Sequence, residues 1–382
     1  MKRINKVKKN IAVFFILMLA CFSDGFSQLP ANGFKIKGNI IQSENKIIYI
    51  TYYNGEQSVI DSSKLINGNF EFSGTINYPV IARLRLTSDL DGDPLSLFLD
   101  STIMNVRISS NPFAIINVQG SKPHQELSEW ITLKNDTKSR LTRLLVAAEI
   151  EKDEEKLKLL EDSIVLYNDE RKRIEFDFFK SHSQSYATAF ALIFSYRNYT
   201  VDELRGMYNN MGNELQMSSD GEYLLKHINE MEPSAVGKMA KDFSGKDIMT
   251  GKDFSLQEAQ GKYVFIDFWG SWCIPCIELI PSLVGEHAKY KDHDIIFLSV
   301  AYDNERDLSK AKAIIKEKHM DWVNLWQDRK VEENSITAKF DVRAYPTTVI
   351  IDPTGKIIYK RDGSEDFVKV TRLLAQIFDG GL

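Results

Sequence analysis

Two cysteines separated by two residues, Cys273 and Cys276, have the spacing in this sequence that most clearly predicts chemistry. Residues 263–269, just before them, are rich in β-branched and aromatic side chains and predict a buried strand. Pro275 is tolerated in the first turn of a helix, because its missing N–H would be unpaired there. In a helix that begins at Cys273, this sulfur faces the positive end of the helix dipole and Cys276 lies within disulfide reach. The pattern therefore predicts thiol–disulfide exchange.

The second sulfur matters more for this chemistry than a lowered pKa of the first. A thiol with a pKa of ~8.5 is about 3% thiolate at pH 7, and a pKa of ~7 raises that fraction about 16-fold, to roughly half. Nucleophilicity falls with basicity and takes back about 4- to 6-fold of this gain. A second thiol held close to the first resolves the mixed disulfide.

The sequence around the cysteines resembles a thioredoxin fold, and within it the TlpA/ResA-type periplasmic reductases. The resemblance is carried by the motif DFWGSWCIPC, by Pro281 five residues after the second cysteine, and by Ala344-Tyr-Pro-Thr347 near the C-terminus. It covers roughly residues 233–382 and implies an α/β thioredoxin-like domain there.

The resemblance also implies a role for each matching residue. Cys273 would be the attacking thiol and Cys276 the buried resolving thiol. Pro346 would be a cis-proline opposite them, and Tyr345 would offer backbone groups to an extended segment of the substrate.

One departure from the family pattern concerns the proton donor and acceptor. The TlpA/ResA type usually carries a glutamate three residues after the second cysteine, where this chain has Leu279, with Glu278 one place earlier. Asp267 matches the buried acid of ordinary thioredoxins, six residues before the first cysteine. A carboxyl group inside an apolar strand has a raised pKa and can exchange a proton with the resolving thiol. We expect Asp267 to be this base and Glu278 to be a secondary candidate, while a buried acid without a proton role remains the alternative.

Two tryptophans flank the turn before the cysteines. Trp269 is expected to pack in the core. Trp272 is interpreted as an exposed lid against the thiols and the substrate backbone, with core packing as the alternative.

Length, charge and cysteine count limit the remaining possibilities. At 382 residues the chain exceeds one thioredoxin unit of ~110–150 residues, so two or three domains are expected. A net charge of −5 gives no basic footprint for nucleic acid. The third cysteine, Cys21, is remote, and no second cysteine pair or closely spaced histidine pair completes a zinc site. We therefore expect neither a metal nor a cofactor.

The N-terminus reads as an export signal. Residues 1–27 combine a basic start with a short apolar run at 11–20, which is too short to span a bilayer of ~30 Å. Cleavage after Ser27 predicts a protein of the periplasm or cell envelope, whereas the loose lipobox that ends at Cys21 predicts a lipid-anchored one. An exported CxxC protein needs an external source of electrons. The resemblance implies a membrane electron donor of the DsbD/CcdA kind.

Two further regions precede the thioredoxin-like part. Residues 34–120 predict an antiparallel β-rich module, a sandwich or twisted sheet, that resembles a domain of Gram-negative envelope proteins. Residues 121–232 show helical periodicity and predict an arm that spaces the two ends or forms a homodimer. Residues 232–237 read as the linker, so the domains are 1–27, 34–120, 121–232 and 233–382.

The sequence thus favours an envelope enzyme that mainly reduces protein disulfides, with the haem-site cysteines of apocytochrome c as one implied substrate. Ile274 and Pro275 place no cation between the cysteines, which disfavours a strongly oxidising pair. One alternative is a peroxiredoxin-like peroxide reductase, although Gly270 stands where those relatives have threonine. The other is a non-catalytic envelope protein that binds partners through the β module.

Overall fold

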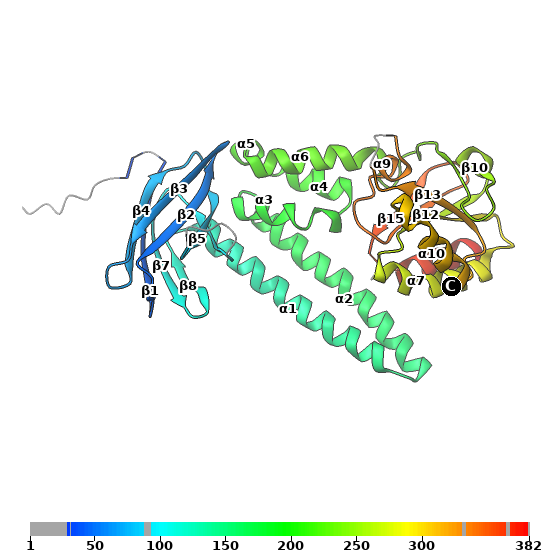
Figure 1. Ribbon diagram of the computed structural model, residues 1–382, viewed down its shortest axis with the longest axis horizontal. Helices are drawn as coiled ribbons and strands as arrows, with labels where there is room; N and C mark the ends of the chain where they lie inside the picture. The colour runs from blue at the N-terminus through cyan, green and yellow to red at the C-terminus, as the bar shows by residue number, and fades with distance from the viewer. Residues whose placement is uncertain (1–28, 31, 88–92, 331–333, 364–366, 381–382) are drawn as a thin grey trace, which may run out of the picture.

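The computed structural model describes residues 29–30, 32–87, 93–330, 334–363 and 367–380. Figure 1 shows three units in a row, a β sandwich, a helical unit and an α/β domain, in chain order. This arrangement confirms the predicted fold class. The expected export signal, with Cys21 and Ser27, lies outside the described residues. Within the described ranges, no helix has the length and apolar character needed to cross a membrane.

The first unit is a sandwich of two four-stranded sheets, in the orders β4-β1-β7-β8 and β3-β2-β5-β6. Inward-facing apolar side chains of both sheets form one core. All pairs are antiparallel, as predicted, except β1 with β7, which is parallel. The strands are β1 (Gly33–Ile41), β2 (Ile47–Asn54), β3 (Gln57–Lys64), β4 (Asn69–Thr75), β5 (Val80–Arg85), β6 (Leu95–Leu99), β7 (Ile103–Ser110) and β8 (Phe113–Gln119).

Close packing explains a glycine in the middle of β1. A Cβ atom on Gly38 would lie 1.9 Å from the ring of Phe70 on the neighbouring strand β4. Phe70 can therefore fill the core above Gly38 only because this position has no side chain.

The helical unit begins with a long hairpin, to which shorter helices are added. Its core includes Phe98 of β6, so the sandwich and the helices share buried surface. The sequence carries the Ser/Thr-x-x-Glu pattern of a capping box at Thr200–Glu203 and at Ser219–Glu222. The structure has the first box, whereas α6 is capped by Ser218, which accepts the N–H of Gly221. The helices are α1 (Lys122–Ile150), α2 (Glu154–Ser181), α3 (Tyr186–Ile193), α4 (Val201–Asn209), α5 (Asn213–Gln216) and α6 (Ser219–Met231).

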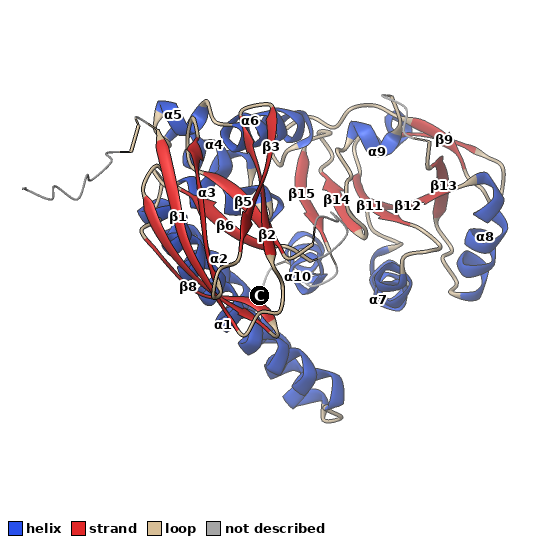
Figure 2. Ribbon diagram, turned by 60° about the vertical axis from the view of Figure 1, so that its left-hand side comes forward, coloured by secondary structure: helices blue, strands red, loops and turns tan. Residues whose placement is uncertain are grey.

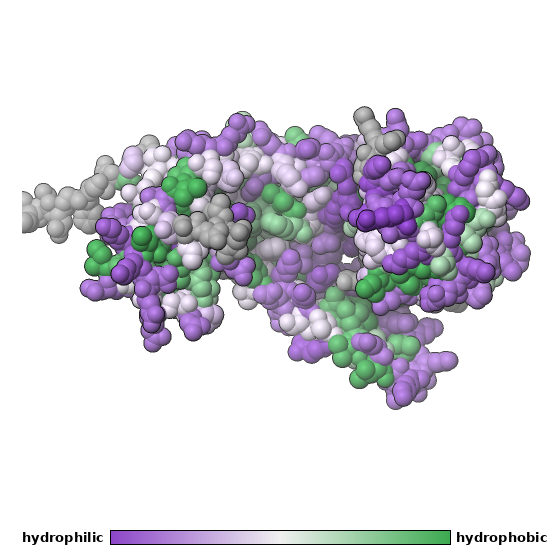
Figure 3. All heavy atoms as spheres, viewed as in Figure 1, coloured by the Kyte–Doolittle hydropathy of each residue, from purple (hydrophilic) through white to green (hydrophobic). Residues whose placement is uncertain are grey.

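The outer half of the α1–α2 hairpin exposes apolar side chains, which Figure 3 shows in green. Leu145, Val146, Ile150 and Leu159 are each exposed by 40–72%. We call these four residues the hairpin patch. Exposed apolar surface of this kind often marks a contact with another molecule.

The α/β domain has a central five-stranded sheet in the order β13-β12-β11-β14-β15. Strands β11, β12 and β13 are parallel, while β14 pairs antiparallel with β11 and β15 pairs antiparallel with β14. Figure 2 shows α7, α8 and α10 on one face of this sheet and α9 on the other. The strands are β11 (Tyr263–Trp269), β12 (Ile295–Asp303), β13 (Val323–Asp328), β14 (Thr347–Ile351) and β15 (Ile357–Asp362). The helices are α7 (Ile274–Tyr290), α8 (Leu308–Glu317), α9 (Ile336–Lys339) and α10 (Phe367–Phe378).

A short hairpin leads into this domain, with strands β9 (Ser244–Lys246) and β10 (Asp253–Ser255). The segment before it, predicted as a linker, is tied down at both ends. It begins with a 3-10 turn, η2 (Glu232–Ser234), and the N–H of Gly237 donates to the carbonyl of Ile357 at 2.7 Å. Ion pairs Arg197–Asp362 and Lys369–Asp169 also join the helical unit to the α/β domain.

Candidate active site

Cys273 and Cys276 form a disulfide at the start of helix α7. Cys273 is the N-cap residue, and its Sγ accepts the backbone N–H of Cys276 at 3.2 Å. The helix therefore begins where the sequence placed it, with the first sulfur at the positive end of the helix dipole. Both cysteines are nearly buried in this oxidised state, at 4% and 2% exposed, so the burial that the resemblance implied for Cys276 is shared by Cys273.

The turn before Cys273 is held by a buried carboxylate that sequence reasoning missed. The backbone N–H of Ser271 donates to Asp303 at 3.0 Å, and the Ser271 hydroxyl donates to the same carboxylate at 2.9 Å. Asp303 is fully buried at the end of β12. Because β11 and β12 are parallel neighbours, their carboxyl ends meet at one edge of the sheet, and this pairing is the signal that could have found Asp303.

Asp267 lies in β11 on the sheet face that α7 covers. It shares this face with Phe265, which packs against Leu279, and with Trp269, which packs against Cys276. Burial raises the pKa of Asp267 to about 7, although a hydrogen bond from Ser299 opposes the shift. Its Oδ1 has no hydrogen-bond partner among the described residues.

An incompletely bonded carboxyl group with this pKa can take or give a proton near neutral pH. The role of Asp267 as the base stays a prediction, with a buried acid that exchanges no proton as the alternative.

Glu278, the secondary candidate for the base, is not brought to the sulfurs. It is exposed on α7, two residues after Cys276, which places it about 200° around the helix. Leu279 occupies the buried position instead and packs in the core. Of the two carboxyl groups predicted as the base, only Asp267 therefore lies on the sheet face that α7 covers, whereas Glu278 is exposed on α7 itself.

The peptide bond between Tyr345 and Pro346 is cis, as the resemblance implied. Pro346 is buried and directly precedes β14. The side-chain ring of Tyr345 lies edge-to-face with the ring of Trp272, with ring centres 5.4 Å apart. The loop with the cis-proline and the loop with the first cysteine therefore meet through two aromatic rings.

Trp272 is 42% exposed beside the disulfide, as the lid interpretation requires, whereas Trp269 is fully buried, as predicted. The indole Nε1 of Trp272 donates to the carbonyl of Tyr302 at 2.9 Å. The guanidinium group of Arg329 lies 4.8 Å from the ring centre of Trp272, and the ring of Tyr302 stacks on Tyr345 at 5.2 Å. Tyr302 lies near the end of β12 and Arg329 directly follows β13, so both were missed in the sequence because they belong to no local motif with the cysteines.

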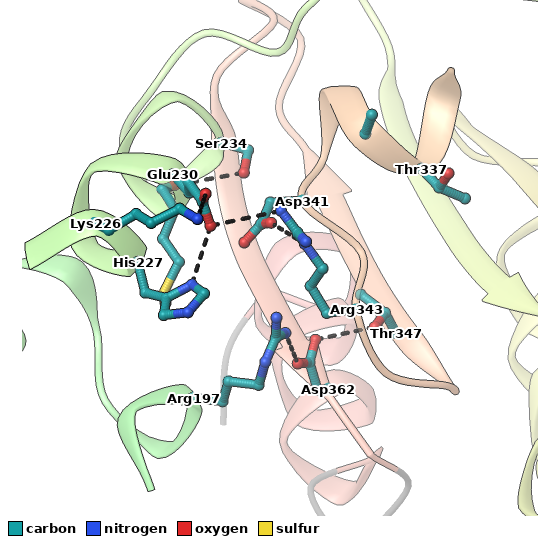
Figure 4. A network of polar contacts seen from close by, with 12 residues as sticks. Arg197, Lys226, His227, Glu230, Ser234, Thr337, Asp341, Arg343, Thr347 and Asp362 are labelled. Atoms are coloured by element: carbon teal, nitrogen blue, oxygen red, sulfur yellow. Dashed lines mark hydrogen bonds and ion pairs between the residues drawn. The ribbon is translucent and has the colours of Figure 1, made fainter. Parts of the chain in front are cut away.

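A polar network connects the cis-proline loop to the helical unit (Figure 4). Asp362 accepts the hydroxyl of Thr347, which directly follows Pro346, at 2.9 Å. The other oxygen of Asp362 pairs with Arg197 of the helical unit at 2.8 Å. On the preceding side of the loop, Arg343 contacts Glu230 of α6 at 3.6 Å. The helical unit thus helps to position the segments on both sides of the proline.

In the described ranges, no three histidine, cysteine, aspartate or glutamate side chains cluster as a metal site would require.

Comparison with known families gives two matches along the chain. A model of the AhpC/TSA family matches residues 236–360, and a model of a domain of unknown function, DUF4369, matches residues 34–127. The first match covers the α/β domain as far as β15, without α10, and the second covers the sandwich and the start of α1.

Individual proteins are similar to the α/β domain. The thioredoxin-like protein YneN of Bacillus subtilis is 33% identical over 121 residues, which are 32% of this chain and 68% of that protein. The thiol-disulfide oxidoreductase ResA of Bacillus cereus is 28% identical over 151 residues, 40% of this chain and 83% of that protein. The crystal structure of the thioredoxin domain of a thiol-disulfide oxidoreductase from Bacteroides vulgatus is 27% identical, with a TM-score of 0.33, and the match covers 37% of this chain and 98% of that one.

Proposed function

Because this chain belongs to the thioredoxin-like thiol-disulfide oxidoreductases, through an α/β domain of the ResA type, we propose that it mainly reduces protein disulfides in the periplasm or cell envelope. The observation that carries the proposal is the Cys273–Cys276 pair at the start of α7, which packs with Tyr345, the residue before cis-Pro346, and lies on the sheet face that holds Asp267.

The reaction begins with the reduced pair. The thiolate of Cys273, stabilised by the backbone N–H of Cys276 and by the helix dipole, attacks one sulfur of the substrate disulfide. A mixed disulfide with Cys273 forms, and the first substrate thiolate leaves. Asp267 takes the proton of Cys276, which then attacks the sulfur of Cys273. The second substrate thiolate leaves, two electrons have passed to the substrate, and the disulfide described here remains.

The turn before the cysteines supports disulfide exchange over peroxide reduction. A Cβ atom on Gly270 would lie 2.5 Å from Nε1 of Trp272 and 3.0 Å from the carbonyl of Tyr302. The threonine that peroxide-reducing relatives carry at this place therefore does not fit without displacing Trp272. Consumption of hydrogen peroxide by the protein with dithiothreitol, at a rate matching its disulfide reduction, would revive the peroxide alternative.

The direction of electron flow is tested by a redox titration of the pair against glutathione or dithiothreitol. No cation lies between the two cysteines, so we expect a potential nearer that of thioredoxin, about −270 mV, than that of a strong oxidant. A value near about −120 mV would overturn the reductase proposal.

The natural substrates are tested by trapping. In a Cys276→Ser variant the mixed disulfide with Cys273 cannot be resolved, so substrates remain attached and can be identified by mass spectrometry. Apocytochrome c among the trapped proteins would support a role in cytochrome c maturation, and its absence from cells that make cytochrome c would exclude that role. A membrane protein of the DsbD/CcdA kind is the proposed donor, and its deletion should leave the pair oxidised in cells.

We propose export with cleavage after Ser27, and a homodimer formed through the hairpin patch. Mass spectrometry of the mature N-terminus separates cleavage after Ser27 from lipid attachment at Cys21. Sedimentation equilibrium tests the dimer. If the wild type sediments as a monomer, or if Ile150→Lys and Leu159→Lys leave a dimer intact, the hairpin patch is not the interface.

A further inference from the structure

Trp272, the exposed indole beside the disulfide, is held by more than one neighbour. Its Nε1 donates to the backbone carbonyl of Tyr302 at 2.9 Å, and its ring lies edge-to-face with the ring of Tyr345 at 5.4 Å. The χ2 torsion of a tryptophan is broad, so a single hydrogen bond leaves the ring free to tilt about the bonded atom. Trp272 is 42% exposed, and core packing therefore does not fix the rest of the ring. Its orientation depends on what lies against its faces.

The guanidinium group of Arg329 lies over the Trp272 ring. The Cζ atom of Arg329 is 4.8 Å from the ring centre of Trp272 and 5.8 Å from the ring centre of Tyr302. Both distances are within the ~6 Å over which a cation is attracted to an aromatic face. A planar guanidinium group also stacks on such a face. Arg329 thus bridges the exposed indole and the neighbouring phenol ring.

The backbone brings Arg329 to these rings. Arg329 directly follows β13, which pairs in parallel with β12, and Tyr302 lies one residue before the end of β12. The carboxyl ends of parallel strands meet at one edge of a sheet. The hydroxyl of Tyr302 also donates to the backbone carbonyl of Arg329 at 2.9 Å, which ties the chain after β13 to β12. The fold therefore sets the position of Arg329, and its flexible side chain does not do so alone.

Tyr302 connects the same contacts to the cis-proline loop. Its ring stacks on the ring of Tyr345 at 5.2 Å with 14° between the ring planes, and Tyr345 directly precedes cis-Pro346. Tyr345 also packs against the apolar cluster that contains both cysteines. The turn before the first cysteine, the cis-proline loop and the ends of two strands thus meet in a group of three aromatic rings and one guanidinium, which are those of Trp272, Tyr302, Tyr345 and Arg329.

We propose that Arg329 is a positioning residue, which fixes the indole of Trp272 against the cis-proline loop so that a protein substrate meets a preformed surface. The inference rests on the proposed function, because a substrate disulfide must approach this surface. Arg329 acts through Trp272 and takes no part in the electron transfer. A preformed surface avoids the cost of ordering side chains on binding. Loss of Arg329 should therefore weaken the binding of protein substrates and leave the chemical step unchanged.

A direct contact between Arg329 and an acidic group of the substrate is a different role and predicts a different result. In that role the guanidinium group pairs with a carboxylate of the substrate, so its loss would leave Trp272 unaltered in the free protein. The two roles therefore differ before any substrate is added.

The hold on Trp272 is measured without any redox step. In the ¹⁵N-labelled, full-length oxidised protein, the indole N–H signal of Trp272, one of five tryptophans, is the signal missing from a Trp272→Phe variant. Exchange of this proton with water requires opening of its hydrogen bond to Tyr302. In Arg329→Met the exchange should accelerate about two- to five-fold, because an exposed cation–π contact contributes ~0.5–1 kcal/mol.

A matched variant separates the ring contact from the charge. Lys330→Met removes the same charge from the next residue, which is also exposed, whereas the cation over the Trp272 ring belongs to Arg329. Exchange of the Trp272 indole proton in Lys330→Met should equal that of the wild type.

Substrate kinetics measure the consequence for the reaction. With insulin, Arg329→Met should raise KM about two- to five-fold and leave kcat unchanged, since the lost contact affects binding alone. With bis(2-hydroxyethyl) disulfide, which is too small to cover Trp272 while it reacts, Arg329→Met should equal the wild type. Lys330→Met should equal the wild type with both substrates.

The two measurements together decide the proposal. Faster exchange and a raised KM for insulin in Arg329→Met, with neither in Lys330→Met, would support it. A raised KM with unchanged exchange would assign Arg329 a direct contact with the substrate, and faster exchange with an unchanged KM would make the ring contact purely structural. Either of these results would overturn the positioning role, as would equal effects in the two variants.

Failure of the proposed enzyme function would look different. A wild type that reduces neither insulin nor the small disulfide contradicts that function, and with it the positioning role. A wild type that reduces both, with Arg329→Met and Lys330→Met alike in exchange and KM, contradicts only the role of Arg329.

Discussion

The α/β domain and the sandwich differ in where their polar groups come together. In the α/β domain, the disulfide, Asp267 and the cis-proline lie within one fold unit, where a strand end, a helix start and a loop meet. In the sandwich, the polar and aromatic residues of interest lie on the outside of a sheet and form a cavity only with helices that come later in the chain. A reactive site can therefore be encoded by a local motif, whereas a cavity can arise between units that have no motif of their own.

The largest expected effect is on disulfide reduction, which should depend on the α/β domain and not on the outer face of the sandwich. Cys273→Ser removes the attacking sulfur, so reduction of insulin disulfides by the purified protein should fall to the uncatalysed rate. Arg107→Gln, on the outer face of the sandwich, should leave this rate unchanged. Residual turnover by the cysteine variant above that of dithiothreitol alone would place the chemistry elsewhere in the molecule.

Asp267→Asn should change both activity and the dependence of stability on pH. The pKa of Asp267 is raised in the folded protein from 3.8 to about 7, so the folded state binds a proton that the unfolded state has lost. The free energy of unfolding should therefore decrease between pH 4 and 7 by up to about 4 kcal/mol, and should then stay level above pH 7. Urea titrations across this range should show a flatter profile for the asparagine variant.

Activity gives the second measurement on Asp267. Resolution by Cys276 should slow by roughly 10²-fold when the base is lost, which is the lower end for general base catalysis. A pH–rate profile that is the same in wild type and variant would remove Asp267 from the mechanism.

Arg197→Met tests whether the helical unit positions the cis-proline loop. The variant leaves one oxygen of Asp362 without its partner, and kcat/KM for a protein disulfide should fall by several-fold, about 1 kcal/mol, through a higher KM. Arg205→Met is the matched control, because Arg205 pairs with Glu232 at 2.7 Å and does not contact Asp362. If the two variants have equal kcat/KM, the Arg197 ion pair contributes to stability and not to the position of the cis-proline loop.

The smallest effect concerns the start of α6. Ser218→Ala should lower the free energy of unfolding by about 1 kcal/mol, because Ser218 caps the helix, whereas Ser219→Ala should change it little. Thermal unfolding of the two variants distinguishes the observed cap from the one that the sequence pattern predicted.

Sequence predicted best what depends on neighbours along the chain. The strand at Tyr263–Trp269 and the helix that follows Cys273 were placed correctly, because burial pattern, proline position and capping act locally. Strand β3 is a polar, exposed edge strand without apolar alternation, so no local pattern predicts it. The parallel pairing of β1 with β7 was also missed, since pairing partners far apart in sequence leave no local pattern.

The same limit applies to the site. Cys273, Cys276 and Asp267 follow from one motif, and Pro346 from another. Asp303 and Arg329 reach the site only because parallel strands end at the same edge of the sheet. The cavity between the outer face of the β3-β2-β5-β6 sheet and helices α3 and α6 was not predicted, because its walls come together only in the folded chain.

Asp362 divides its two oxygens between Thr347, beside the proline, and Arg197, from a different unit. Removal of the residues before 233 would therefore leave one of those oxygens exposed to water, even if every later strand and helix folded as before. An isolated C-terminal fragment thus differs from the intact protein beside the cis-proline, and rates measured on one should not be transferred to the other.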